Sequence, residues 1–333
     1  MTPALVIVDG SSRVAEARRL ATTAARAEGL EPTATEEAGI IATELATNLV
    51  KHAASGELHI TRLSHGGDAG VEILSIDRGP GMANVPLCMM DGYSTTGTAG
   101  TGLGAVSRLA SAFDGYSQPG RGTVIAARKY RDPAGKQAER WVFGAVTAPY
   151  PGETVCGDNW SARHKGHSSS IIVADGLGHG VLASDASSAA IATFRTGPSE
   201  SAVSMLEDVH RALRPTRGAA VAVSFIEHEK RQVHYAGIGN IAGVVLGGAR
   251  AQFMVSHNGT AGLEARRLQE FDYKLPEEAI LVMHSDGIAT SWTLDPYPGV
   301  TRRHPSIIAG LLYRDASRGR DDVCVLVGKY FRE

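Results

Sequence analysis

Residues 71–82 read VEILSIDRGPGM, and residues 91–104 read DGYSTTGTAGTGLG. In the first stretch an apolar strand ends at Asp77, which is followed closely by Gly79 and Gly81. An aspartate in that position can accept a hydrogen bond from an exocyclic amine, while bare glycine backbone lets a flat ring approach. The second stretch places several glycines before an expected helix, and free N–H groups at a helix N-terminus bind phosphate. Together the two stretches indicate a nucleotide site.

An amphipathic helix is expected upstream of these stretches, beginning where Thr33 and Glu36 fit a capping box. Glu44, Asn48 and His52 are spaced four apart, so they would share one side of this helix, away from its apolar stripe. Spacing alone leaves open a solvated polar face. The neighbouring glycine-rich stretches favour a ligand-binding face instead.

Hydrophobic spacing divides the chain into two halves of different pattern. The first half predicts helices over residues 12–28 and 103–113 and strands over 58–63, 71–76 and 123–130. The second half predicts more strands, with helices over residues 181–195, 199–213 and 304–315. Strands mixed with segregated helices indicate the α+β class. We expect domains at residues 1–131 and 141–333, joined by a polar linker at 132–140.

Length and composition exclude several classes of protein. The chain has 333 residues, which favours two domains, and a formal net charge of −2, which offers no electrostatic footprint for nucleic acid. Its three cysteines are scattered, so a disulfide framework and a thiolate zinc site are not expected. A basic leader and a run of 18 apolar residues are both absent from the sequence, so we expect a soluble, cytoplasmic protein without membrane attachment.

Acidic residues in the second half stand at strand ends or turns, usually beside glycine. They are Asp158, Asp175, Asp286 and the pair Asp321–Asp322. Turn chemistry explains any one of them, because Asp and Gly are ordinary turn residues. Several together would resist ionisation unless cations neutralised them, and oxygen ligands suit Mg²⁺ or Mn²⁺. His179 could act as a general acid or simply be a hydrogen-bonded turn residue.

The polar helix and the two glycine stretches, in this order, resemble the N, G1 and G2 boxes of the GHKL ATPase/kinase superfamily. Residues 89–124 are similar to the RsbT-type serine/threonine switch kinases in particular. The resemblance implies a GHKL (Bergerat) α/β sandwich over roughly the first 130 residues, with ATP and Mg²⁺. It also implies that Asn48 coordinates Mg²⁺, that Glu44 orients or activates the attacking nucleophile, and that Asp77 binds adenine. The other nucleotide contacts it implies are Gly79, Gly81, Gly100, Thr101, Gly102, Leu103, Gly104 and Thr123.

The acidic motifs of the second half resemble the SpoIIE/RsbX branch of the metal-dependent type-2C (PPM) phosphatases, over about residues 140–331. The resemblance implies an α-β-β-α sandwich with two Mn²⁺ or Mg²⁺ ions. Asp175 would bridge the two metals, and Gly176 would lend its carbonyl oxygen to one of them. The further ligands it implies are Asp158 for the first metal, and Asp286 and Asp321 for the second. Asp322 stays open as the alternative to Asp321.

The two resemblances together imply a bifunctional regulator of bacterial stress signalling. Its kinase would phosphorylate a STAS-domain protein of a stressosome-like or partner-switching module, and its phosphatase would remove phosphate from the same or a linked regulator. In an alternative, the first half is an ATP-bound binding module that sequesters a sigma factor or activates another phosphatase. An RsbW-type anti-sigma kinase fused to its opposing phosphatase is a third reading. GHKL switch kinases often pair, so a homodimer is also open.

Overall fold

The computed structural model describes residues 3–53, 55–63, 69–88, 102–132, 139–265 and 267–332. The chain forms two compact units. The N-terminal unit comprises Pro3–Lys136 and Leu294–Arg314, and the C-terminal unit comprises Gln137–Thr293 and Asp315–Glu333. A segment of 21 residues from the second half therefore belongs to the N-terminal unit. The domain limits expected from the sequence stay a prediction.

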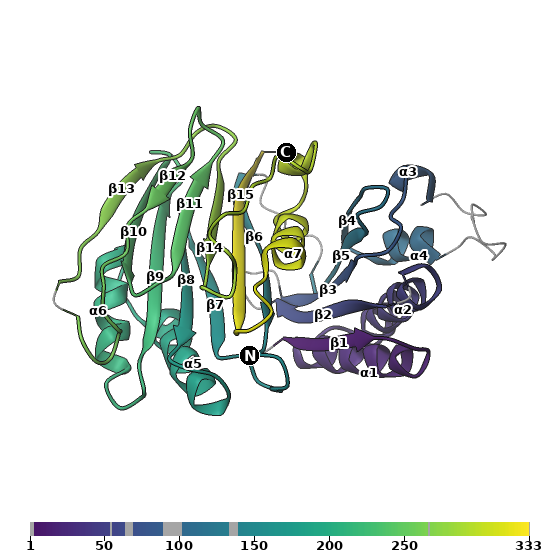
Figure 1. Cartoon of the computed structure of the whole chain (residues 1–333), viewed down its shortest axis with the longest axis horizontal. Helices are drawn as coiled ribbons and strands as arrows, with labels where there is room; N and C mark the ends of the chain where they lie inside the picture. The colour runs from purple at the N-terminus through teal and green to yellow at the C-terminus, as the bar shows by residue number, and fades with distance from the viewer. Residues whose placement is uncertain are drawn as a thin grey trace. The chain divides into compact units, whose positions relative to one another are not determined.

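The N-terminal unit is built on one antiparallel five-stranded sheet (Figure 1). In spatial order its strands are β1 (Ala4–Val8), β2 (Gly56–Leu63), β3 (Gly70–Asp77), β5 (Thr123–Tyr130) and β4 (Ala112–Ser117). Alternate residues of the central strands, among them Ile73 and Ile125, pack with the helices in one core. The neighbouring residues point to the other face, because successive side chains of a strand alternate. The sheet therefore needs cover on both faces.

Helices α1 (Ser12–Ala27) and α2 (Pro32–Asn48) cover the first face (Figure 1). Alanines at both helices' contact positions let them pack closely. The expected capping box is wrong, since α2 begins at Pro32 after an N-cap at Glu31 that makes no side-chain cap bond. Proline has no N–H to satisfy, so it replaces a cap at the first helical position. After α2 the helix widens into a π-turn, η1 (Leu49–Ala53).

Short helices α3 (Val85–Cys88) and α4 (Gly102–Leu109) lie near the glycine-rich stretches. The helix expected over residues 103–113 ends at Leu109, because β4 begins three residues later and pairs with β5.

Helix α7 (Pro305–Ala316) packs on the second face of the N-terminal sheet. A Cβ added to Gly310 would lie 2.8 Å from a side-chain carbon of β5, so the helix approaches the strand closely. Glu72 and Arg128, from neighbouring strands, form an ion pair there, and Ser306 donates to the Glu72 carboxylate over 2.6 Å. All three side chains are buried. The buried charges of Glu72 and Arg128 thus balance each other at this interface.

The C-terminal unit holds two antiparallel five-stranded sheets that share one core. The first sheet has, in spatial order, β13 (Phe271–Lys274), β10 (Gln232–Ile238), β9 (Ala219–Glu227), β8 (Ser168–Gly176) and β7 (Asp158–Lys165). The second sheet has β12 (Gln252–Met254), β11 (Ala242–Leu246), β14 (Ile280–His284), β15 (Val323–Arg332) and β6 (Glu139–Ala148). Figure 1 shows the two sheets as successive layers of this unit.

Helices α5 (Val181–Thr196) and α6 (Ala202–Ala212) cover the outer face of the first sheet in this unit. A second core of alternate β8, β9 and β10 residues joins them to the strands. A 3-10 turn, η2 (Val300–Arg302), precedes α7. The two-domain α+β class expected from the sequence is confirmed. Of the helices that the structure describes, none is long and apolar enough to cross a membrane.

Candidate functional sites

The start of α4 lies over two polar side chains of α2. A Cβ added to Gly102 would lie 3.1 Å from Glu44 Oε2 and 3.5 Å from Asn48 Oδ1. Glu44 and Asn48 are both half-buried, and their spacing of four places them one turn apart on the helix. The structure therefore brings an acid, a carboxamide and a helix N-terminus together, which is an arrangement suited to a metal-bound phosphate.

Of the other residues predicted near the start of α4 and the end of α2, those that the structure describes do not belong to this group of side chains. Leu103 is partly buried against the helical core, and Gly104 is buried within α4. Gly100 and Thr101 lie outside the described residues. His52 is exposed in the π-turn, beyond the end of regular α-helical spacing, so the periodicity argument does not extend to it.

Asp77, at the end of β3, is held by backbone on both sides. Its Oδ1 accepts hydrogen bonds from the N–H of Gly79, at 2.7 Å, and of Thr123, at 3.2 Å. Burial raises the pKa of Asp77, and these two N–H groups oppose that rise. Gly122 has a φ of 77°, and a Cβ on it would lie 2.1 Å from the Asp77 carbonyl oxygen. The β4–β5 turn is therefore pressed against this aspartate by a glycine that no other residue can replace.

Gly79 and Gly81 are needed by the fold as well as by any ligand. A Cβ on Gly79 would lie 2.9 Å from the Ala53 Cα atom. Gly81 has a φ of 69°, and its Cβ would lie 2.0 Å from the carbonyl oxygen of Gln118. The loop after β3 is thus packed between the end of η1 and the β4–β5 turn, which fixes the position of Asp77.

Four of the predicted acidic residues lie at the ends of strands in the C-terminal unit. Asp158 opens β7 and faces Asp175 of β8 across the antiparallel register. Asp286 follows β14, and Asp321 precedes β15, the strand paired with it. Electrostatic effects show that the four are neighbours, because the charges of Asp286 and Asp321 both raise the pKa of Asp175.

The cluster is short of positive charge. Burial and the charges of Asp286 and Asp321 raise the pKa of Asp175 to about 7. Burial, with the charge of Asp175, raises the pKa of Asp158 well above its usual range. Neither carboxylate oxygen of Asp158 has a hydrogen-bond partner among the described residues. Buried carboxylates without donors need cations, and an all-oxygen donor set fits Mg²⁺ or Mn²⁺.

Asp321 and Asp322 have different surroundings. Asp322 is buried, and its Oδ1 accepts a hydrogen bond of 2.8 Å from the N–H of Tyr150. Asp321 is half-buried, and its charge raises the pKa of Asp286 after the larger effect of burial. A Cβ on Gly157 would lie 2.6 Å from Asp322 Oδ2, so Asp322 fills the space beside the start of β7.

Gly176 connects the acidic cluster to α5. A Cβ on it would lie 2.0 Å from the carbonyl oxygen of Ala183, so the backbone after Asp175 can approach the helix only because this residue is glycine. The N–H of Gly176 donates to the carbonyl of Gly157 over 3.2 Å. The backbone at Gly176 is thereby fixed next to Asp175, between the start of β7 and α5.

Several contacts near the cluster were not expected from the sequence. Asn240, which follows β10, donates to Asp286 Oδ2 over 2.7 Å. His179 does not bond to backbone; its Nδ1 lies 2.9 Å from Glu153 Oε1, and its ring stacks on Tyr150. These side chains are far apart in the chain, so no local motif could have revealed the contacts.

An arginine also lies beside the loop that follows Asp175. Arg217 donates to the carbonyl of Leu177, two residues after Asp175, over 3.0 Å. The guanidinium of Arg318 opposes the rise in the pKa of Asp286 that burial causes. Arg318 thus lies near one carboxylate of the cluster, where a phosphoryl group would need opposite charge.

A cavity of about 560 Å³ opens at the other end of the C-terminal strands. Its lining includes Trp141, His228, Arg231 and Tyr330, and none of the predicted site residues. Burial lowers the pKa of His228 to about 4, so this histidine is neutral near pH 7. The cavity is therefore separate from the acidic cluster.

Comparisons with known proteins match the two halves of the chain to two different families. Residues 10–129 match the histidine kinase-like ATPase domain family, and residues 165–330 match the stage II sporulation protein E (SpoIIE) family. The serine/threonine-protein kinase RsbT of Bacillus subtilis (strain 168) is 39% identical over 87 residues, which are 26% of this chain and 65% of RsbT. The phosphoserine phosphatase RsbX of the same strain is 33% identical over 90 residues, which are 27% of this chain and 45% of RsbX. The chain thus spans less than two thirds of either relative.

Solved structures give the same picture of the fold. A chain from a structure of the bacterial stressosome, described as a modular system adapted to control secondary messenger signaling, is 26% identical with a TM-score of 0.53. The match covers 57% of this chain and 99% of that one. RsbX in complex with magnesium is 21% identical with a TM-score of 0.51, over 59% of this chain and 98% of RsbX, and shares its fold. The chain is therefore a fusion of a histidine kinase-like ATPase domain with a SpoIIE-type domain of the PP2C phosphatase class.

Proposed function

We propose that this protein is a bifunctional switch enzyme of the cytoplasm. The N-terminal domain transfers phosphate from ATP to a serine or threonine of a STAS-domain protein. The C-terminal domain, with Mg²⁺ or Mn²⁺, removes phosphate from the same protein or from a linked regulator. Similarity to a kinase in one half and to a phosphatase in the other supports opposed activities in one chain.

The observation that carries the phosphatase assignment is the buried acidic cluster. Asp175 would bridge two cations, with Asp158 on the first, Asp286 on the second, and the Gly176 carbonyl completing one of them. Two cations would acidify a bound water and hold the phosphoryl group for in-line attack. Asn240 would orient Asp286 through the hydrogen bond it donates.

Asp321 is the better candidate than Asp322 for the last ligand. The Oδ1 of Asp322 already accepts the N–H of Tyr150 in a buried position. Asp321 is more accessible, and its charge raises the pKa of Asp175 and Asp286, whereas that of Asp322 raises the pKa of Asp175 and Asp158. We assign Asp322 the task of holding the backbone next to the cluster.

The kinase assignment rests on the group of side chains beneath α4. Asn48 would hold the Mg²⁺ of the nucleotide, and Glu44 would accept the proton of the attacking hydroxyl. Asp77 would receive the adenine amine, since its position is fixed by two backbone donors. The glycines at 100, 102 and 104, with Thr101, would leave N–H groups free for the phosphates.

Hydrolysis of a small aryl phosphate tests the phosphatase without any partner. The chain should turn over the substrate with Mn²⁺ and not with a chelator, and Asp175→Asn should lower the rate at least a hundredfold. Asp185→Asn is the matched control, because this aspartate is exposed on α5. Metal-independent turnover, or an Asp175→Asn variant as active as the control, would contradict the metal assignment.

Transfer of labelled phosphate from ATP to a STAS-domain protein tests the kinase. Glu44→Ala should abolish transfer while nucleotide binding persists, because Glu44 is proposed to act on the hydroxyl. If the wild-type chain binds ATP and transfers nothing to any STAS-domain protein of its organism, the N-terminal domain is an ATP-bound binding module for a sigma factor or another phosphatase.

A further inference from the structure

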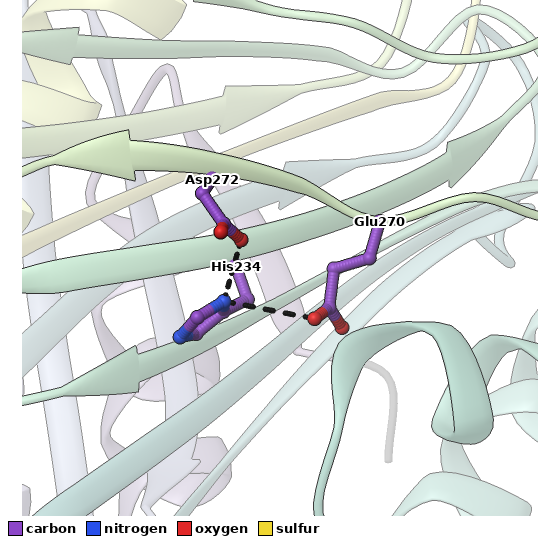
Figure 2. A group of neighbouring side chains, drawn as sticks. All are labelled: His234, Glu270 and Asp272. Carbon is purple, nitrogen blue, oxygen red and sulfur yellow. Dashed lines mark hydrogen bonds and ion pairs between the residues drawn. The ribbon is translucent and has the colours of Figure 1, made fainter.

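Three side chains on the first sheet of the C-terminal unit converge on one point, well away from the acidic cluster. His234 is the third residue of β10, Asp272 lies opposite it on the edge strand β13, and Glu270 immediately precedes β13. Figure 2 shows both carboxylates directed at the same ring nitrogen. Asn240, which contacts the acidic cluster, follows the other end of β10.

The three ligand atoms lie close enough together to share one cation. His234 Nδ1 lies 2.7 Å from Asp272 Oδ1 and 3.6 Å from Glu270 Oε1, and the three ligand atoms lie within 4.8 Å of one another. Donor atoms about 2.0 Å from a tetrahedral zinc ion lie roughly 3.3 Å apart, which is between the two measured values. If Nδ1 of His234 carried a proton, that N–H group could point at only one of the two carboxylate oxygens.

The second ring nitrogen of His234 is also engaged by an acid. Its Nε2 lies 2.9 Å from Glu227 Oε1, and the other oxygen of Glu227 is paired with Lys230. A histidine that ligates a metal commonly donates its other N–H to a carboxylate, which fixes the tautomer. With a metal bound, the proton would lie on Nε2, and the lone pair of Nδ1 would face Asp272 and Glu270. Two carboxylates and a lone pair repel one another unless a cation lies between them.

The ligands are held in place and remain reachable. The Oε2 of Glu270 accepts the N–H of Val203, in the first turn of α6, over 3.1 Å, which leaves Oε1 for the site. The His234 side chain is 16% exposed, whereas that of Asp272 is 59% exposed and gives a path from solvent. A metal site needs such an entry path as well as fixed ligands.

We infer that His234, Glu270 and Asp272 form a second metal site, which takes a borderline divalent cation such as Zn²⁺. The imidazole nitrogen distinguishes it from the all-oxygen acidic cluster, which suits Mg²⁺ or Mn²⁺. The three ligands leave the fourth position of a tetrahedral ion to water. The bound ion fastens the short edge strand β13 to β10 and to the first turn of α6.

Zinc titration against a chromophoric chelator, in millimolar Mg²⁺, tests this inference on the full-length chain. The wild type should bind one equivalent of Zn²⁺ tightly. His234→Gln and Asp272→Asn should each weaken that equivalent at least tenfold. Asp272 is exposed on an edge strand, so we expect Asp272→Asn to fold. If His234→Gln fails to fold, Asp272→Asn still tests the site.

Two control variants separate this site from the rest of the molecule. Asp175→Asn should keep the tight equivalent, because the acidic cluster is not involved. His167→Gln should keep it too, since His167 is an exposed histidine paired with Glu229. Loss of the tight equivalent in Asp175→Asn alone would overturn the inference. So would a wild type that binds no Zn²⁺ tightly, in which case His234 is an imidazolium held between its carboxylates.

Discussion

Replacing Asp175 by asparagine should stabilise the metal-free C-terminal domain while it abolishes the response to metal. The pKa of Asp175 is raised from 3.8 to about 7, first by burial and then by the charge of Asp286. Each pKa unit is worth about 1.4 kcal/mol, so ionising this group in the folded state costs up to roughly 4 kcal/mol at about pH 8. Neighbouring acids share the proton, which lowers the expected difference to about 2–4 kcal/mol.

The sign of the pH dependence follows from the direction of the shift. Below about pH 4 Asp175 is protonated in both the folded and the unfolded chain and contributes no difference. Between about pH 4 and pH 7 only the folded chain keeps the proton, so the free energy of unfolding falls as the pH rises. The metal-free wild type should therefore be more stable at about pH 5 than at pH 8, and Asp175→Asn should flatten this dependence.

Tryptophan fluorescence during urea unfolding reports on the relevant domain. All three tryptophans, Trp141, Trp160 and Trp292, belong to the C-terminal unit. With a chelator at about pH 8, Asp175→Asn should unfold at higher urea than the wild type, and saturating Mn²⁺ should reverse the order. The exposed Asp185→Asn serves as the control. An Asp175→Asn variant that is less stable than the metal-free wild type, or still stabilised by Mn²⁺, would refute the reasoning.

Three further outcomes are expected elsewhere in the chain. Gly122→Ala should weaken binding of a fluorescent ATP analogue at least tenfold, because the added Cβ would lie 2.1 Å from a backbone atom. The control is Gly120→Ala, which should leave the affinity nearly unchanged. Gly120 also has a positive φ, but an added Cβ there would have no atom within 4 Å. Glu72→Gln leaves the buried Arg128 without its counter-charge and should lower the free energy of unfolding by about 3–5 kcal/mol. Urea unfolding followed by far-UV circular dichroism measures this loss. Adding Arg128→Met should recover part of it. Asn240→Ala should raise the Mn²⁺ concentration for half-maximal aryl phosphatase activity roughly tenfold, since the metal-site carboxylate loses its donor.

Sequence reasoning worked best where the chemistry lies in contiguous stretches. The glycines around Asp77 and at the start of α4 lie in short stretches of the chain, so their spacing can be recognised in the sequence. The same is true of the aspartates at strand ends: the neighbouring Gly176 is required by a close backbone approach, and the neighbouring Gly157 by the side chain of Asp322. Family comparison then agrees with both halves of the chain.

Sequence reasoning failed where a partner lies far along the chain. Asn240 was not recognised as a site residue, because Asp286 is 46 residues away. The cover that α7 gives the N-terminal sheet was not foreseen, although Glu72 and Arg128, opposite charges within two apolar strands, were a readable signal of a buried pair. The helix expected over residues 103–113 ends early, and residues 112–117 form β4, because pairing with β5 outweighs local preference.

The central claim is that one chain both adds and removes phosphate on a shared regulator. Its most direct test is the amount of labelled phosphate on a STAS-domain protein incubated with the chain, γ-labelled ATP and Mn²⁺. The account predicts strong labelling by Asp175→Asn, weak steady-state labelling by the wild type, and none by Glu44→Ala. Equal labelling by the wild type and Asp175→Asn would contradict it, because the phosphatase would then act on some other protein.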